Sequence, residues 1–79
     1  MNRAEIEAEL RAHLAEASGR EPEAVDLGEP FEALGLDSVA RVELLARLED
    51  AFCVHVPPED AIHLETGSAL VRYLVRQRS

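Results

Sequence analysis

Residues 34–52 decide the fold of this chain and read LGLDSVARVELLARLEDAF. Asp37 has the short carboxylate side chain that favours a helix N-cap, which places Ser38 at the first helical position. No glycine or proline follows before Phe52, so the stretch predicts a helix over residues 38–52. A serine at a helix start holds its hydroxyl at the surface, beside the open N–H groups and the positive end of the helix.

The predicted helix has two apolar faces. At 100° per residue, one sector collects the side chains expected to enter the core, namely Leu44, Leu45, Leu48 and Phe52. The nearly opposite sector collects three smaller apolar side chains, namely Val39, Val42 and Ala46. Carboxylates flank this second sector, at Glu43, Glu49 and Asp50. One face must meet the core, so the other should face solvent or a partner.

The residues before this helix predict a second helix and a long loop. Asn2 and Glu5 have the spacing of a capping box, and apolar side chains then recur every four positions, which predicts a helix over residues 3–17. Residues 19–37 contain two prolines, three glycines and no sustained helical period. A connection this long should lie against the helices. The side chains expected to hold it there are Val25, Leu27, Phe31, Leu34 and Leu36.

The residues after the central helix predict one short and one longer helix. Pro58 suits the start of a short helix that continues over residues 59–64. Thr66 is the expected cap of a last helix, whose start Gly67 should weaken slightly. Its apolar stripe consists of Leu70, Val71, Leu74 and Val75. The predicted fold is all-α: a small four-helix bundle of three main helices and one short helix, with a long first loop, forming a single domain over residues 1–79.

Charge and hydropathy exclude several classes of function. The formal net charge is −8, and residues 21–65 carry twelve acidic residues against two arginines. Such a surface repels nucleic-acid phosphates and favours partners with basic patches. No apolar run approaches the roughly 20 residues of a membrane span, and the N-terminus lacks the pattern of a signal peptide. We therefore expect a cytoplasmic monomer that binds neither nucleic acid nor membranes.

The sequence offers no set of catalytic residues and no metal ligands. The turn that ends in Ser38 lacks the second glycine of a hydrolase nucleophile elbow, and no nucleophile–base pair is evident. The three histidines lack metal-ligand spacing. Cys53 has no second cysteine with which to form a disulfide within the chain, and we expect it to be a small packing residue.

The Gly-x-Asp-Ser turn at residues 35–38, followed by Glu43-Leu44, resembles the signature of the acyl carrier and peptidyl carrier protein family. The resemblance extends over roughly residues 5–75. It implies that a separate phosphopantetheinyl transferase esterifies Ser38 with the 4′-phosphopantetheine of coenzyme A. It also implies that Asp37 caps the helix and assists that transferase with its metal. Without the flanking match, an ordinary capping serine would be the better interpretation.

The resemblance implies a carrier rather than an enzyme. We expect a stand-alone acyl carrier protein that tethers acyl intermediates as thioesters on the arm at Ser38, in polyketide or other secondary-metabolite biosynthesis. Two alternatives within the family are an aminoacyl or peptidyl carrier of non-ribosomal peptide synthesis and a carrier of fatty-acid synthesis. An alternative of another class is an unmodified acidic protein-interaction module.

The resemblance also places partner docking on the outer face of the central helix. The expected docking residues are Val39, Val42, Glu43, Ala46, Glu49 and Asp50, together with Ile62 on the short helix. Besides the transferase, the implied partners are acyl- or aminoacyl-loading enzymes, synthases and thioesterases with basic docking patches. An acidic surface with a shallow apolar strip should give fast, weak and salt-sensitive encounters.

Arg41 projects with the core stripe, one turn after Ser38. Its guanidinium is always charged and must reach water or an anion. Two interpretations remain open. Either the Arg41 stem crosses the mouth of the pocket that fatty chains enter in related carriers, which would favour a short or polar cargo, or its head turns aside to a neighbouring carboxylate and blocks nothing.

Overall fold

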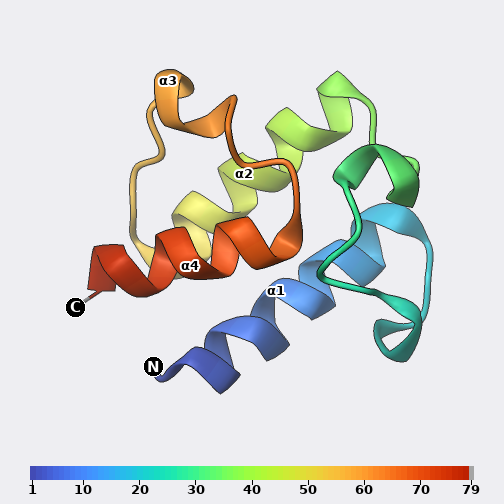
Figure 1. Ribbon diagram of the computed structural model, residues 1–79, viewed down its shortest axis with the longest axis horizontal. Helices are drawn as coiled ribbons and strands as arrows, with labels where there is room; N and C mark the ends of the chain where they lie inside the picture. Colours follow the sequence, from blue (N-terminus) through green and yellow to red (C-terminus); the bar gives the residue numbers. More distant parts are fainter. Residues whose placement is uncertain (79) are drawn as a thin grey trace.

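The computed structural model describes residues 1–78, and Figure 1 shows their arrangement. Within them lie the four helices α1 (Arg3–Ser18), α2 (Ser38–Phe52), α3 (Pro58–Ala61) and α4 (Gly67–Arg78). Two 3₁₀ turns, η1 (Pro22–Ala24) and η2 (Phe31–Leu34), interrupt the α1–α2 connection. The predicted all-α bundle of three main helices and one short helix is therefore confirmed.

The short helix differs from its prediction at both ends. It begins at Pro58, one residue earlier than the range 59–64, and already ends at Ala61. The following N–H groups of His63 and Leu64 donate to carbonyls three residues back, at 3.1 Å in each case. This tighter pattern closes the segment as turns, which suits a connection that must return to α4 within a few residues.

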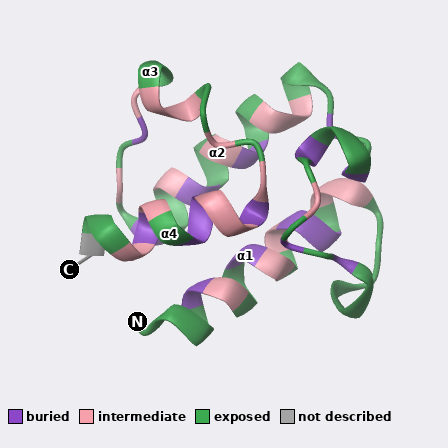
Figure 2. Cartoon of the chain, in the orientation of Figure 1, coloured by how far each residue is buried: buried purple, intermediate pink, exposed green. Residues whose placement is uncertain are grey.

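Helix α1 packs against both α2 and α4, and the three long helices enclose the core (Figures 1 and 2). The most deeply buried side chains are Ile6, Leu10 and Leu14 of α1, Leu48 and Phe52 of α2, and Leu70, Val71 and Leu74 of α4. The predicted stripes are confirmed, with Leu45 and Val75 half-buried at the edge of the core. Helix α3 contributes no buried residue.

The long first loop lies down on the bundle as predicted, and all five of its expected apolar anchors are buried. Backbone hydrogen bonds fix it beside the start of α4: Phe31 N–H donates to the Glu65 carbonyl, and Ser68 N–H donates to the Leu27 carbonyl, each at 2.8 Å. A Cβ on Gly67 would lie 2.8 Å from Leu27 Cδ2 and 3.3 Å from Leu27 Cα. The glycine that weakens the helix start therefore permits the loop to approach.

The helix caps are largely those expected from the sequence. Asn2 and Glu5 form both bonds of the capping box at 2.9 Å, and Thr66 Oγ1 accepts from Ala69 N–H at 3.1 Å. The expectation that Cys53 is a small packing residue is wrong. Cys53 ends α2 with φ of 53°, in the left-handed region, and its side chain is exposed. Among residues 1–78, no helix is long and apolar enough to cross a membrane.

Candidate functional site

Ser38 lies exposed at the first position of α2, on a turn that is fixed from both sides. Asp37 Oδ1 accepts from Ala40 N–H at 2.8 Å, which confirms the predicted cap. Before it, Gly35 ends η2 with φ of 79°, a conformation that suits glycine, and Leu36 is buried. The turn is therefore anchored in the core immediately before the chain presents Ser38 to solvent.

The start of α2 suits an anionic group on the Ser38 hydroxyl. The first N–H groups of a helix have no carbonyl partner within it, and Asp37 occupies only that of Ala40. The N–H groups of Ser38 and Val39 and the positive end of the helix dipole therefore face any group on Ser38. The residues present thus fit the phosphodiester that the sequence resemblance implies at this position.

An apolar groove begins at Ser38 and separates α2 from α3. Its first part is a pocket of about 220 Å³ lined by Ser38, Arg41, Val42, Leu45, Ala61 and Ile62. Its second part, of about 340 Å³, shares Val42, Leu45, Ala61 and Ile62 and adds Ala46, Glu49, Val56 and Pro58. We call the two parts together the α2–α3 groove. It gives a group attached at Ser38 an apolar surface along which to lie.

The structure brings most of the predicted docking residues onto one exposed face beside this groove. Val39 and Val42 are each 67% exposed and Ile62 is 66% exposed, values that are high for branched apolar side chains. Ala46, Glu43 and Asp50 are also exposed. These six residues, from α2 and the turn after α3, form what we call the docking face.

Glu49 differs from the other predicted docking carboxylates. It is half-buried, and its Oε2 accepts from Val56 N–H at 2.8 Å and lies 3.1 Å from His55 Nδ1. The carboxylate therefore ties the chain after α2 back onto the helix. A simple helical projection places Glu49 at the surface but contains no information about this contact.

Arg41 is held by an aromatic ring. Its guanidinium carbon lies 5.8 Å from the centroid of the Phe31 ring, a cation–π distance, and the residue is half-buried. In the part of the chain that the structure describes, no ion pair joins Arg41 to a carboxylate, so its head does not turn aside as the second interpretation expected. Besides the groove, Arg41 lines a pocket of about 210 Å³ with Pro30, Glu32 and Glu65.

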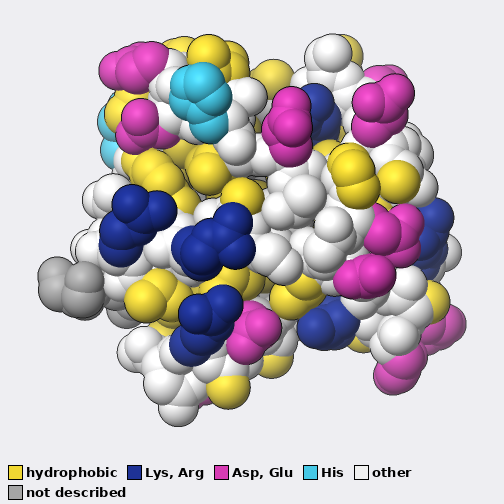
Figure 3. All heavy atoms as spheres, in the orientation of Figure 1, with side chains coloured by type: hydrophobic (Ala, Val, Ile, Leu, Met, Phe, Trp, Pro, Cys, Tyr) yellow, Lys and Arg dark blue, Asp and Glu magenta, His cyan; other side chains and the backbone are white. Residues whose placement is uncertain are grey.

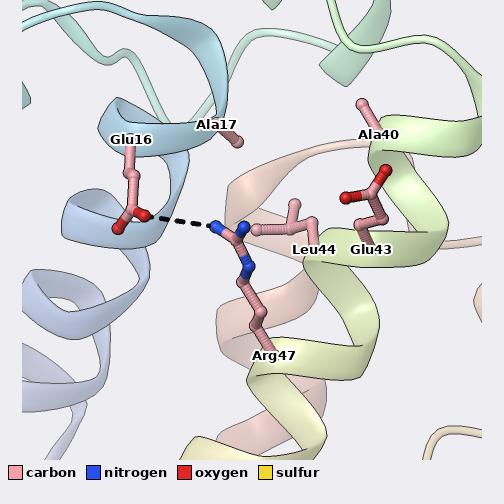
Figure 4. Close-up of a pocket in the computed structure, with 6 residues that line it drawn as sticks. All are labelled: Glu16, Ala17, Ala40, Glu43, Leu44 and Arg47. Atoms are coloured by element: carbon pink, nitrogen blue, oxygen red, sulfur yellow. Dashed lines mark hydrogen bonds and ion pairs between the residues drawn. The ribbon is translucent and has the colours of Figure 1, made fainter.

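A further pocket, of about 240 Å³, lies on the other side of α2, against α1 (Figure 4). There Arg47 Nη1 lies 3.4 Å from Oε1 of Glu16, an exposed ion pair that bridges the two helices. Leu44 and two alanines complete most of its lining. Arg41 and Arg47 thus lie on the same helix, but among the described residues only Arg47 has a carboxylate partner.

Helix α3 is tied to α4 by a side-chain hydrogen bond. The Tyr73 hydroxyl donates to Asp60 Oδ2 at 2.9 Å. Partial burial raises the pKa of Tyr73 above its ordinary value, and the bond to Asp60 raises it further. Figure 3 shows arginine side chains over α4. The docking face, by contrast, carries the exposed carboxylates Glu43 and Asp50. The acidic docking face is therefore a better match for a basic partner than the arginine-bearing surface of α4.

The chain is similar in sequence to known proteins. A family model described as the phosphopantetheine attachment site matches residues 8–74. An acyl carrier protein from Rhodococcus erythropolis (strain PR4 / NBRC 100887) is 38% identical over 71 residues, which cover 89% of this chain and 78% of the relative.

Solved structures show the same fold. A free-standing peptidyl carrier protein from an uncharacterized secondary metabolic pathway of Acinetobacter baumannii superimposes with a TM-score of 0.86 at 29% identity, covering 99% of this chain and 98% of the other. The acyl carrier protein from Enterococcus faecalis superimposes with a TM-score of 0.81 at 28% identity, covering 96% and 98% respectively.

Proposed function

The chain belongs to the phosphopantetheine-attachment family of carrier proteins, and we propose that its phosphopantetheine group is carried on Ser38. Proteins of this family are carriers and not catalysts, and they interact with enzymes such as synthases and transferases. The observation that supports Ser38 is its position: an exposed hydroxyl at the capped start of α2, at the head of the α2–α3 groove.

Ser38 and Asp37 have separate parts in the proposed attachment. The Ser38 hydroxyl loses its proton and forms an ester bond to the pantetheine-side phosphorus of coenzyme A, while the pyrophosphate bond breaks and adenosine 3′,5′-bisphosphate leaves. Asp37 holds the helix start in place through Ala40 N–H, so the hydroxyl is presented at a constant position. Once attached, the group supplies a terminal thiol on which an acyl cargo is held as a thioester.

Mass spectrometry with a phosphopantetheinyl transferase tests the attachment site. With coenzyme A, the wild-type protein should gain the mass of one phosphopantetheine group, and Ser38→Ala should gain none while keeping its helical circular-dichroism spectrum. Ser68 is a matched control because, like Ser38, it lies near the start of a helix, α4. Unlike Ser38, it is half-buried, and its hydroxyl donates to the Leu27 carbonyl at 3.1 Å. Ser68→Ala should still be modified. A modified Ser38→Ala protein would contradict the assignment.

We further propose an acyl cargo in polyketide or other secondary-metabolite biosynthesis. The 38% identical relative from Rhodococcus is an acyl carrier protein, and the Acinetobacter neighbour belongs to a secondary metabolic pathway. Because that neighbour is a peptidyl carrier, an aminoacyl cargo is the second candidate. Incubating the modified protein with acyl-loading and aminoacyl-loading enzymes separates the two, since only the matching class should add its mass.

Partner enzymes are proposed to bind the docking face. Its apolar side chains provide a shallow contact area, and Glu43 and Asp50 provide exposed carboxylates for a basic patch. Reversing both to lysine should lower the rate of transfer to a partner about tenfold or more at low salt, chiefly through slower association. The same reversal at Glu21 and Glu23, exposed carboxylates in the first loop, is the matched control and should have a much smaller effect. Equal losses in both variants would mean that net charge matters and this face does not.

A further inference from the structure

Arg41 is an unusual cation for its surroundings. Residues 21–65 contain twelve acidic residues and only two arginines. Arg47 is paired with Glu16 at 3.4 Å (Figure 4), whereas Arg41 forms no ion pair within residues 1–78. A guanidinium has five N–H donors, and stacking on Phe31 occupies its face without satisfying them. No carboxylate within residues 1–78 pairs with these donors, so they are available to another acceptor.

The position of Arg41 relative to Ser38 indicates where that acceptor would be. The two residues are three positions apart on α2, so their Cβ atoms are about 5–6 Å apart. Helical side chains lean toward the N-terminus, which carries the Arg41 side chain back over the turn that presents Ser38. Both residues line the same pocket of about 220 Å³ at the head of the α2–α3 groove. An anionic group on the Ser38 hydroxyl is thus within reach of the guanidinium.

We propose that Arg41 binds an anionic oxygen group of the arm on Ser38 and thereby positions the root of that arm. This inference rests on the proposed attachment at Ser38. Two groups present anionic oxygens that a guanidinium binds: the phosphodiester of the arm and a carboxylate on the cargo. The geometry favours the phosphodiester, because it is bonded directly to Ser38 Oγ, whereas a cargo is held at the far end of the arm. Arg41 is then a positioning residue that directs the arm along the groove.

The competing anions belong to the protein. Glu32 and Glu65 line the neighbouring pocket with Arg41, on the side of the first loop. If Arg41 turned to one of them, it would leave the groove and the arm would have no cation at its root. Stacking on the ring of Phe31, at 5.8 Å from the ring centroid, opposes such a turn.

Nuclear magnetic resonance of the intact protein tests the contact. We would first confirm by intact mass that the arm is on Ser38, and then record the ³¹P signal and the arginine Nε–Hε signals of the unmodified and modified forms. The Arg41 Nε–Hε signal should shift on modification, and Arg41→Gln should shift the ³¹P signal. Arg47→Gln is the matched control, because it removes the same charge from the same helix, and it should leave the ³¹P signal in place. Arg41→Lys keeps the positive charge, so its ³¹P signal should lie closer to the wild-type position than the signal of Arg41→Gln.

The outcomes separate this inference from the proposed function. Failure of Ser38 to gain the group would contradict the proposed function and, with it, the contact. A modified protein whose Arg41 signal does not move would contradict only the contact. Loading the arm with a carboxylated acyl group and with a neutral one of equal length distinguishes the two anions. If Arg41 responds only to the carboxylated cargo, the phosphodiester is not its ligand and the proposal is overturned.

Discussion

Helices α2 and α3 face each other across the groove that begins at Ser38, but they are held in different ways. Helix α2 has 15 residues, a side-chain cap at Asp37 and three buried side chains. Helix α3 has four residues, no side-chain cap bond and no buried side chain (Figure 2). Helix α2, one wall of the groove, is therefore part of the core. Helix α3, the other wall, is a short segment that lies on the surface of the core.

The attachments of α3 are few, and most of them are polar. Tyr73 of α4 holds Asp60, and Glu49 of α2 holds Val56 just before α3. Val56 is the only buried apolar side chain between the end of α2 and the start of α3. Segments with few buried apolar contacts open at low free-energy cost. We infer that the groove changes its width mainly by movement of α3 and of Ile62 after it, while α2 keeps Ser38 and the docking residues on α2 in a constant position.

The largest expected difference between the two walls is in their contribution to stability. Phe52→Ala removes a side chain that is 1% exposed, and should lower the free energy of unfolding by about 3–5 kcal/mol. Ile62→Ala removes a side chain that is 66% exposed, beside α3, and should change it by no more than about 0.5 kcal/mol. Urea unfolding followed by circular dichroism measures both. Similar losses of unfolding free energy in the two variants would mean that Ile62 contributes more to stability than its exposure indicates.

A smaller effect is expected at the cap of α2. Asp37→Ala removes the acceptor of Ala40 N–H and should cost about 1 kcal/mol of unfolding free energy. Asp37→Asn is the matched control, because an amide oxygen can still accept this bond, and it should cost much less. The same unfolding assay distinguishes them. Equal stability of the alanine and asparagine variants would show that the cap bond does not stabilise the fold.

The smallest expected effect is local to α3. Tyr73→Phe removes the hydrogen bond to Asp60 and should cost about 0.5–1.5 kcal/mol or less, because the bond is only part-buried. Amide hydrogen exchange should become faster in residues 58–64 and stay unchanged in α2. Faster exchange throughout α2 would contradict the inference that α3 opens independently of α2.

The stability of the protein should depend on pH in the alkaline range through Tyr73. The folded protein holds the Tyr73 proton more tightly than the unfolded chain, because its pKa is raised above 10.0. The stabilisation is therefore fully present below pH 10 and is lost as the pH rises through the raised value. The wild-type protein should lose more stability than Tyr73→Phe across this alkaline range. Parallel losses in the two proteins would contradict a raised pKa at Tyr73, which burial and the bond to Asp60 cause.

Much of the fold and the position of the candidate site followed from local sequence patterns. The capping box at Asn2, the caps at Asp37 and Thr66 and the apolar periodicities predicted both ends of α1 and α2, and the start of α4, within one residue. The Asp37 cap predicted that Ser38 begins α2 with its hydroxyl at the surface, because a helix start and its open N–H groups depend only on neighbouring residues. These features could be predicted since each arises within about one helical turn of the residues that cause it. The choice of Ser38 as the attachment site came from the resemblance of residues 35–44 to the carrier-protein signature.

Other features depend on contacts between distant parts of the chain, and only the tertiary structure decided them. Gly67 allows the close approach of Leu27, and Glu49 is committed to Val56 instead of being left to partners. Arg41 stacks on Phe31 from the first loop, a contact that a helical projection of α2 cannot contain. A periodicity states which direction a side chain takes from its own helix. What that side chain meets depends on how the elements pack, and packing is determined by the whole core.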